Sequence, residues 1–216
     1  MESQECPLCL SQTVADHFYD DKREWPYFKC HNCELVFRDP KTYLSSSEEK
    51  SRYETHNNSI ENRGYVKFLS PCVEMLLPHV TKDHIGLDYG SGPGPIIDQL
   101  FKPHDISVVN YDPYFNFDEG ALEKQYDFVT CTEVFEHMYS PSKDLLKIKK
   151  LIKPNGLLLL MTEMYPDKHK FPTWGYRMDN THVLFMSPKS LDWICESMKF
   201  ELIDSSRRIM LLRNLV

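Results

Sequence analysis

The chain has 216 residues, of which 41% are hydrophobic and 26% charged, values typical of a globular protein with one ordinary domain and a small additional unit. Its formal net charge of −7 argues against broad binding to nucleic acid, which usually requires a basic surface. No apolar run approaches the roughly 20 residues of a membrane span, and the N-terminus lacks the features of a signal peptide. We therefore expect a cytoplasmic protein without membrane partners, whose seven cysteines stay reduced.

Residues 1–40 contain two C-x-x-C pairs on either side of the segment 10–29: Cys6 with Cys9, and Cys30 with Cys33. Four thiolates at this spacing are typical of a tetrahedral Zn²⁺ site in which each tight turn supplies two ligands. Between the pairs, residues 17–19 and 25–28 are rich in aromatic side chains and predict short strands. The sequence therefore predicts a zinc ribbon over residues 1–40. The alternative is a pair of disulfides or four buried thiols.

The charge of this first unit bears on its role. Residues 1–40 carry eight acidic and four basic side chains, and four metal-bound thiolates would add negative charge. Such a unit is a poor binder of phosphate groups. We interpret the ribbon as a structural clip or a lid on the rest of the chain. The alternative is a module that recognises RNA.

Residues 41–62 are polar and predict a linker or a lid. Within this segment Tyr53 and His56 are candidates for contact with a cofactor or substrate, and a solvated helix start is the alternative. Residues 63–80 carry apolar side chains at helical spacing, which predicts an amphipathic helix that Pro71 either kinks or divides. We expect residues 63–216 to form the one large domain.

Residues 85–88 predict a short strand that leads directly into a turn with Gly90, Gly92 and Gly94. Glycines allow positive φ values and close approach of a ligand, and the following helix N-terminus favours an anionic group. A second predicted strand, residues 106–111, ends at Asp112. In dinucleotide-binding folds an acidic residue about 20 residues past the glycines holds a ribose diol. Asp112 stands close to that position.

The remaining segments alternate between strand and helix patterns. We expect helices at 95–102, 141–151 and 187–199, buried strands at 126–132 and 157–161, and a final antiparallel pair at 200–204 and 208–215. The segment 113–125 is short for the helix and strand that usually follow Asp112, so either this unit is trimmed or residues 115–122 form it in reduced form. The segment 162–186 should overhang the site, with these side chains as candidate pocket walls: Phe171, Trp174, Tyr176, Arg177, Asp179 and His182.

Four motifs in this order resemble those of class I S-adenosylmethionine (SAM)-dependent methyltransferases: Asp88-x-Gly90-x-Gly92-x-Gly94, Asp112, Tyr126–Thr130 and Leu151–Leu157. NAD is the weaker alternative, because its fingerprint is G-x-G-x-x-G. The resemblance implies an α/β fold with a Rossmann-like, doubly wound sheet of the seven-stranded type, to which the zinc ribbon is added at the N-terminus. It also implies SAM as the cofactor, with contacts from these residues: Tyr53, Asp88, Tyr89, Gly90, Ser91, Gly92, Gly94, Asp112, Pro113, Thr132 and Glu133.

An E-x-x-E-H element, with Glu133, Glu136 and His137, follows the predicted strand 126–132. On a helix these three positions would share one face, and His182 could complete the set of catalytic residues. Carboxylates with imidazole suit Mg²⁺, Mn²⁺ or Fe²⁺, and such a cation would lower the pKa of a bound hydroxyl. Without a metal, His137 or His182 is the best general base.

The same element is similar to that of ubiquinone-pathway O-methyltransferases and of small-RNA 3′-terminal 2′-O-methyltransferases. That resemblance implies metal-assisted methylation of a hydroxyl, although many small-molecule methyltransferases with Glu-His here use no metal. We therefore predict a SAM-dependent methyltransferase that methylates an oxygen of a small molecule. One alternative is an RNA methyltransferase, favoured by the lysines between residues 143 and 153. The other is a SAM-binding regulatory protein without catalytic activity.

Overall fold

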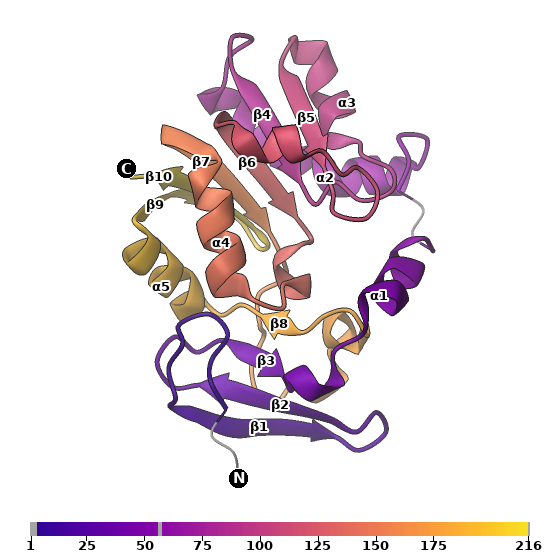
Figure 1. The fold of residues 1–216 in the computed structure, drawn as a ribbon, viewed down its shortest axis with the longest axis vertical. Helices are drawn as coiled ribbons and strands as arrows, with labels where there is room; N and C mark the ends of the chain where they lie inside the picture. The colour runs from indigo at the N-terminus through magenta and orange to yellow at the C-terminus, as the bar shows by residue number, and fades with distance from the viewer. Residues whose placement is uncertain (1–3, 56–57, 216) are drawn as a thin grey trace.

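The structure is a computed structural model that describes residues 4–55 and 58–215, and these residues form two sheets (Figure 1). The smaller sheet has the strand order β1-β2-β3-β8 and the larger one the order β5-β4-β6-β7-β10-β9. No helix in these two stretches is long and apolar enough to cross a membrane. All seven cysteines are present as free thiols.

The first strand of the larger sheet in chain order, β4, lies in the interior of the sheet, and later strands lie on both sides of it. The parallel strands of this sheet are β4 (Ile85–Tyr89), β5 (Ser107–Tyr111), β6 (Tyr126–Thr132) and β7 (Ile152–Met161). Two antiparallel strands complete it beside β7: β10 (Ile209–Asn214) and β9 (Phe200–Ser205). The chain passes from β4 to β5 on one side and then to β6 on the other. A crevice at such a reversal is the usual place for a ligand in open α/β sheets.

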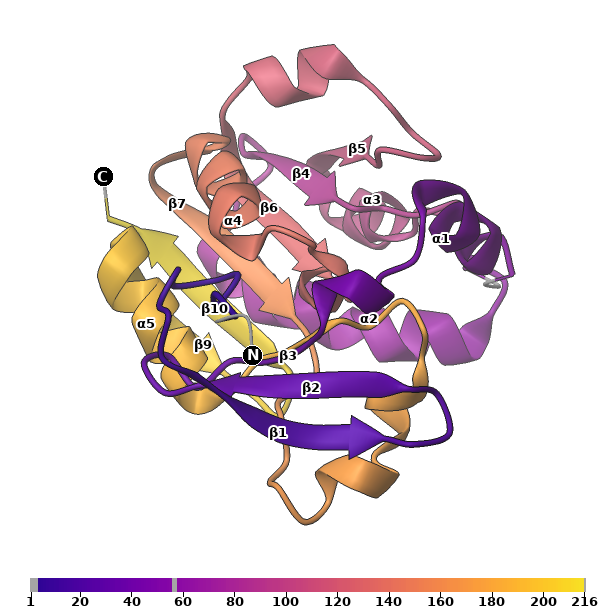
Figure 2. The same cartoon turned by 60° about the horizontal axis from the view of Figure 1, so that its bottom comes forward.

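Two helices cover each face of this sheet (Figure 2). One layer contains α2 (Arg63–Leu76) and α3 (Ile97–Phe101), and the other contains α4 (Pro141–Lys150) and α5 (Pro188–Met198). Strand β7 shows why both layers are needed, because its side chains alternate between the faces. Leu158 and Leu160 pack in the core with α4 and α5, whereas Leu157 and Leu159 pack in the core with α2 and α3. The predicted doubly wound α/β fold is therefore confirmed.

The expected trimming is also present. Between β5 and β6 the chain forms only a 3₁₀ turn at Glu119–Glu123, so the sheet has six strands, one fewer than the seven-stranded type, in the described residues. Helix α2 continues through Pro71 as one helix of 14 residues, so this residue does not divide it. Its buried side chains, among them Leu69 and Leu76, form a continuous apolar face that packs on the sheet.

The smaller sheet combines distant parts of the chain. Strands β1 (Val14–Asp20), β2 (Trp25–Cys30) and β3 (Val36–Arg38) form an antiparallel meander, and β8 (Leu184–Phe185) pairs with β3. The two short strands expected in the first unit are present and longer than expected, whereas the sequence signals did not predict β3 or β8. The segment 41–62 also contains a helix, α1 (Ser46–Tyr53), which begins with a capping box between Ser45 and Glu48.

Candidate active site

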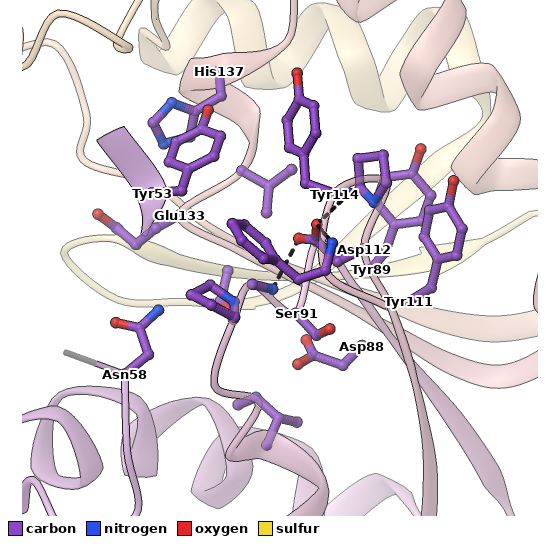
Figure 3. Close-up of a pocket in the computed structure, with 18 of the residues that line it drawn as sticks. Tyr53, Asn58, Asp88, Tyr89, Ser91, Tyr111, Asp112, Tyr114, Glu133 and His137 are labelled. Carbon is purple, nitrogen blue, oxygen red and sulfur yellow. Dashed lines mark hydrogen bonds between the residues drawn. The ribbon is translucent and has the colours of Figure 1, made fainter. Parts of the chain in front are cut away.

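A cavity of about 520 Å³ lies at the carboxyl ends of β4, β5 and β6, at the reversal of strand order (Figure 3). The glycine turn after β4, the segments that follow β5 and β6, and helix α1 all contribute lining residues. The volume is in the range of small-molecule and cofactor sites. This cavity is therefore the candidate active site.

The glycine turn exposes its backbone to the cavity. Gly90 and Gly92 have φ values of +81° and +68°, in the left-handed region that residues with a side chain rarely adopt. A Cβ atom at Gly94 would lie 1.7 Å from the carbonyl oxygen of Asn58, so this position accepts no side chain either. Gly90 and Gly92 line the cavity, whereas Gly94 packs against the segment that carries Asn58.

Asp112 joins the end of β5 to this turn. One carboxylate oxygen accepts a hydrogen bond from the backbone N–H of Gly92 at 2.9 Å, and the other accepts from the N–H groups of Tyr114 and Phe115 at 2.8 and 3.1 Å. The carboxylate is thus fixed at the edge of the cavity, where the sequence motif expects a ribose ligand.

Two buried polar groups lie beside the turn. Burial raises the pKa of Asp88 to about 7, although the Thr130 hydroxyl donates a 2.8 Å hydrogen bond to its carboxyl group. The Ser91 hydroxyl is buried and has no hydrogen-bond partner within the described residues. Since buried polar groups are almost always paired, this hydroxyl suits a polar ligand atom.

Glu133 lies on the cavity wall directly after β6, but not on a helix. Its φ value is +53°, and only a 3₁₀ turn follows, at Phe135–His137. The expected helical face shared by Glu133, Glu136 and His137 is therefore wrong, because the chain turns sharply as it leaves the strand. Burial, with the nearby Glu136 carboxylate, raises the pKa of Glu133 to about 8.

Glu136 does not line the cavity. Its side chain is completely buried and accepts hydrogen bonds from the Thr162 hydroxyl at 2.9 Å and the Tyr176 hydroxyl at 2.5 Å. Two neutral donors hold this carboxylate behind the wall, where it fixes the end of β7 and the following segment. We infer that Glu136 supports neighbouring residues and does not contact substrate.

His137 and His182 lie side by side, with ring centroids 4.7 Å apart, and both line the cavity. The Nδ1 atom of His137 lies 3.1 Å from the carbonyl oxygen of Thr181, and that of His182 lies 2.7 Å from the carbonyl oxygen of Tyr176. A carbonyl oxygen can only accept, so each Nδ1 carries a proton, and in the neutral form of each ring the Nε2 atom can accept one. Burial and the adjacent His137 lower the pKa of His182 to about 4.

Helix α1 adds a side to the cavity that sequence signals indicated only at Tyr53. The buried Glu49 carboxylate accepts hydrogen bonds from the hydroxyls of Tyr53 and Tyr114, both at 2.9 Å. An ion pair of 2.6 Å between Arg52 and Asp179 joins the same helix to the segment after β7. The segment expected to be a linker or a lid thus contains a helix that is joined to the rest of the chain at two places. His56 lies outside the described residues.

The structure brings together most of the residues proposed from sequence. Twelve line the cavity: Tyr53, Asp88, Tyr89, Gly90, Ser91, Gly92, Asp112, Pro113, Thr132, Glu133, His137 and His182. Lys147 belongs to the lysines between residues 143 and 153 that the sequence indicated, but several other lining residues had no sequence signal beyond being aromatic or polar: Glu49, Asn58, Tyr65, Tyr111, Tyr114, Tyr139 and Asp144. They come from separate segments of the chain, and only their common position in the folded chain reveals them.

The expected pocket walls in the segment 162–186 are only partly correct. His182 lines the cavity, but Phe171 and Trp174 pack with Tyr27 and Phe185 in a separate core beside the smaller sheet. The aromatic side chains of this segment are therefore mainly structural, because the smaller sheet offers them an apolar surface.

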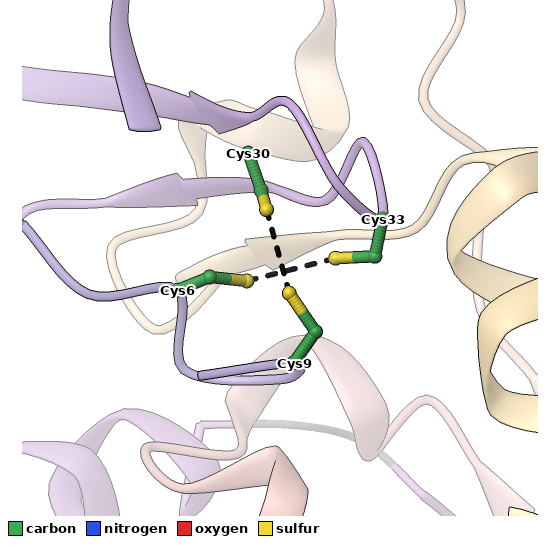
Figure 4. A group of neighbouring side chains, drawn as sticks. All are labelled: Cys6, Cys9, Cys30 and Cys33. Atoms are coloured by element: carbon green, nitrogen blue, oxygen red, sulfur yellow. Dashed lines mark hydrogen bonds between the residues drawn. The ribbon is translucent and has the colours of Figure 1, made fainter. Parts of the chain in front are cut away.

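The four cysteines of the C-x-x-C pairs converge on one point (Figure 4). The Sγ atoms of Cys6 and Cys33 are 3.6 Å apart and those of Cys9 and Cys30 are 3.5 Å apart, and all four lie within 4.8 Å of one another. These separations are too long for disulfides, whose sulfurs are about 2.05 Å apart. They approach the roughly 3.8 Å expected between sulfurs that bind one Zn²⁺ at about 2.3 Å.

Comparison with known proteins identifies the family to which this chain belongs. Residues 60–205 match the methyltransferase domain family. The chain belongs to this methyltransferase family. The match covers every strand of the larger sheet except β10 and all of the residues that form the glycine turn and the segment after β6. The matched residues thus form a methyltransferase domain.

Individual relatives of this methyltransferase are distant. A stretch of 46 residues is 37% identical to a ubiquinone biosynthesis O-methyltransferase of Pasteurella multocida (strain Pm70), and it covers 21% of this chain and 19% of that protein. An O-methyltransferase family protein from Burkholderia thailandensis has a TM-score of 0.52 at 15% identity, over 77% of this chain and 62% of the other.

A SAM-dependent methyltransferase from Archaeoglobus fulgidus is similar to the same degree. Its TM-score is 0.50 at 16% identity, over 68% of this chain and 93% of the other. At such identities the two solved structures show that this chain has the fold of SAM-dependent methyltransferases.

Proposed function

We propose that the cavity binds SAM and that the methyltransferase transfers its methyl group to a hydroxyl oxygen of a small molecule. The observation that carries this proposal is one cavity with a nucleotide-type cradle at one end and two adjacent histidines, each held through Nδ1 by a backbone carbonyl, at the other. The glycine turn and Asp112 would hold the cofactor, with Asp112 on the ribose hydroxyls. When bound, SAM supplies an electrophilic methyl group.

The acceptor hydroxyl must lose its proton as the methyl group is transferred. His137 is suited to accept it, because its Nδ1 proton is committed to the Thr181 carbonyl and its Nε2 lone pair is therefore available. His182 is held neutral by its low pKa, so it does not repel the positive charge that His137 gains. We assign His137 as the general base, and His182 as the residue beside it that also faces the acceptor.

A cation-assisted version of the same reaction is the second candidate. Glu136, His137 and His182 each offer a ligand atom within 4.8 Å of the others, and oxygen with imidazole suits Mg²⁺, Mn²⁺ or Fe²⁺. However, both oxygens of Glu136 already accept hydrogen bonds from Thr162 and Tyr176. This engagement favours proton transfer by His137.

The charge of the cavity favours a neutral or cationic acceptor. One basic side chain, that of Lys147, faces it among the described residues, against five acidic ones: Glu49, Asp88, Asp112, Glu133 and Asp144. A phosphate or carboxylate on the acceptor would still be repelled by this surplus, although the raised pKa values of Asp88 and Glu133 leave these two carboxyl groups partly protonated at neutral pH. The same balance speaks against RNA as the acceptor.

We also propose that the four-cysteine cluster binds a structural Zn²⁺. Cys6, Cys30 and Cys33 are completely buried, and buried thiolates that converge on one point need a cation. Measurement of the metal content by mass spectrometry should give one zinc per chain. A protein that folds without bound metal would overturn this part of the proposal.

The central test is calorimetric titration with SAM, with Asp112→Ala as the comparison, followed by an acceptor screen with labelled methyl groups. We expect binding that Asp112→Ala weakens by at least about tenfold, and transfer to neutral or cationic hydroxyl compounds. The screen is repeated with a chelator, and with His137→Gln. Loss of transfer on chelation, restored by Mg²⁺, Mn²⁺ or Fe²⁺, would favour the cation-assisted version.

Two results would contradict the proposal. Absence of SAM binding to the zinc-loaded protein would refute the cofactor assignment. Tight SAM binding without transfer of the methyl group to any tested acceptor, RNA included, would instead favour a regulatory role without catalysis.

A further inference from the structure

The segment that carries His182 belongs to two structures at once. Strand β8 begins shortly after it and is the fourth strand of the smaller sheet, next to β3 (Figure 1). Leu184 pairs with Phe37. The Val183 carbonyl accepts a hydrogen bond of 2.9 Å from the N–H of Arg38, while the Val183 N–H donates one of 2.8 Å to the Glu136 carbonyl. Val183 thus bridges the N-terminal sheet and the turn after β6.

Arg177 forms the second connection. Its guanidinium is buried and makes an ion pair of 2.8 Å with Asp20, a buried residue at the end of β1. It also donates to the carbonyl oxygens of Phe171, at 2.8 Å, and Pro172. The preceding residue, Tyr176, donates to Glu136 and accepts from the Nδ1–H of His182 through its backbone carbonyl. A shift of Arg177 would therefore move the groups that orient His182.

Arg38 forms the third connection, from β3. Its side chain is completely buried, and it donates to the carbonyl oxygen of Asn180 at 2.9 Å and to that of Thr42 at 3.2 Å. Asn180 immediately precedes Thr181, whose carbonyl oxygen fixes the tautomer of His137. Both histidines thus depend on backbone carbonyls that lie within a few residues of an arginine contact.

The cysteine cluster lies at the other end of the same sheet from Asp20. Cys30 is the last residue of β2, and the carbonyl oxygen of Cys33 accepts a 2.9 Å hydrogen bond from Ser190 in α5. The carbonyl oxygen of Pro7 accepts one of 3.3 Å from Ser142 in α4. Small units with four cysteines commonly fold only with their metal, so the order of this sheet depends on the cluster.

We propose that the metal-closed N-terminal sheet holds residues 175–186 in their active-site positions, with Arg177 and Arg38 as positioning residues. This inference rests on the proposed function for the meaning of those positions. The glycine turn and Asp112 lie at the ends of β4 and β5, which pair only within the larger sheet. Loss of the ribbon metal should therefore disturb the acceptor end of the cavity and leave the SAM end in place.

Hydrogen exchange measured by mass spectrometry tests this without a known acceptor. We expect removal of the metal with a chelator to raise exchange in residues 175–186 by at least about tenfold, and to leave residues 84–95 within about twofold. Arg177→Met should act in the same way, and Arg177→Lys should restore part of the protection because it keeps a charge beside Asp20. SAM affinity, measured by calorimetry on the same samples, should stay within about threefold.

Lys170→Met is the matched control. Lys170 lies shortly before residues 175–186 and pairs with Asp167 at 3.4 Å, but its side chain is 76% exposed and the pair does not involve the N-terminal sheet. Its exchange pattern should equal that of the unmodified protein. Unchanged exchange in residues 175–186 after metal removal would overturn the proposal, and so would equal loss of protection in residues 84–95.

The two proposals can fail separately. If the untreated protein binds no SAM but exchange in residues 175–186 still follows the metal, the cofactor assignment fails and the coupling stands. If Arg177→Met does not fold, metal removal and Arg177→Lys still decide the question, since neither needs that variant. Equal exchange in the unmodified protein and Arg177→Lys, together with no response to the chelator, refutes the coupling.

Discussion

Replacement of Asp88 by Asn should make the protein more stable at neutral and alkaline pH. The carboxyl group is 2% exposed, and burial raises its pKa from 3.8 to about 7. Between these two values the folded state holds a proton that the unfolded state releases. The stability of the unmodified protein therefore falls, through this group, as the pH rises from about 4 to about 7. Asparagine does not ionise and still accepts the hydrogen bond from Thr130.

The size of the effect follows from the pKa values. The difference of about 3 units corresponds to a cost of about 4 kcal/mol above pH 7, since each unit is worth about 1.4 kcal/mol. At pH 5 only about 1.5 kcal/mol of this cost has developed. The free energy of unfolding of Asp88→Asn, relative to the unmodified protein, should thus increase by about 3 kcal/mol between pH 5 and pH 8.

Thermal unfolding at several pH values measures this difference. For a chain of this length the Tm changes by about 2–4 °C per kcal/mol, so the gap in Tm should widen by roughly 6–12 °C between pH 5 and pH 8. Comparison of the two proteins cancels the titration of all other groups. A gap that stays constant over this range would refute the assignment of a buried, partly protonated Asp88.

Three further changes have defined outcomes. Gly86→Ala places a Cβ atom 2.3 Å from the Phe128 ring and should lower the free energy of unfolding by about 1–3 kcal/mol, as measured in urea titrations. The control is Gly175→Ala, whose Cβ would meet nothing within 4 Å and which should leave the free energy of unfolding unchanged. Equal effects of the two substitutions would contradict this packing. Gly94→Ala must displace the Asn58 backbone and should weaken SAM binding by at least about tenfold in calorimetry. Cys9→Ser should abolish bound zinc, measured by metal analysis, and lower the Tm; retention of one zinc per chain would remove this residue from the ligand set.

The extent to which sequence predicted the site depended on the kind of signal. Asp112 was predictable because its distance from the glycine turn is set by one helix and one strand, which have nearly fixed lengths. The arrangement of Glu133, Glu136 and His137 was not, because a positive φ value at Glu133 replaced the expected helix. No pattern in a single segment signals such a turn, since its geometry comes from the end of a buried strand.

The sequence by itself determined the strands and helices of the larger sheet and its two layers, the glycine turn with Asp112, and the convergence of four cysteines. Each depends on short-range spacing: a short, continuous apolar run in β7, glycines at every second position, and two C-x-x-C pairs. Only the tertiary structure decided that Glu49 and Tyr114 meet at the cavity, and that Arg177 pairs with Asp20, 157 residues away in the chain. Contacts between residues so far apart depend on how whole helices and strands pack together, and the local spacing of residues in the sequence does not predict that packing.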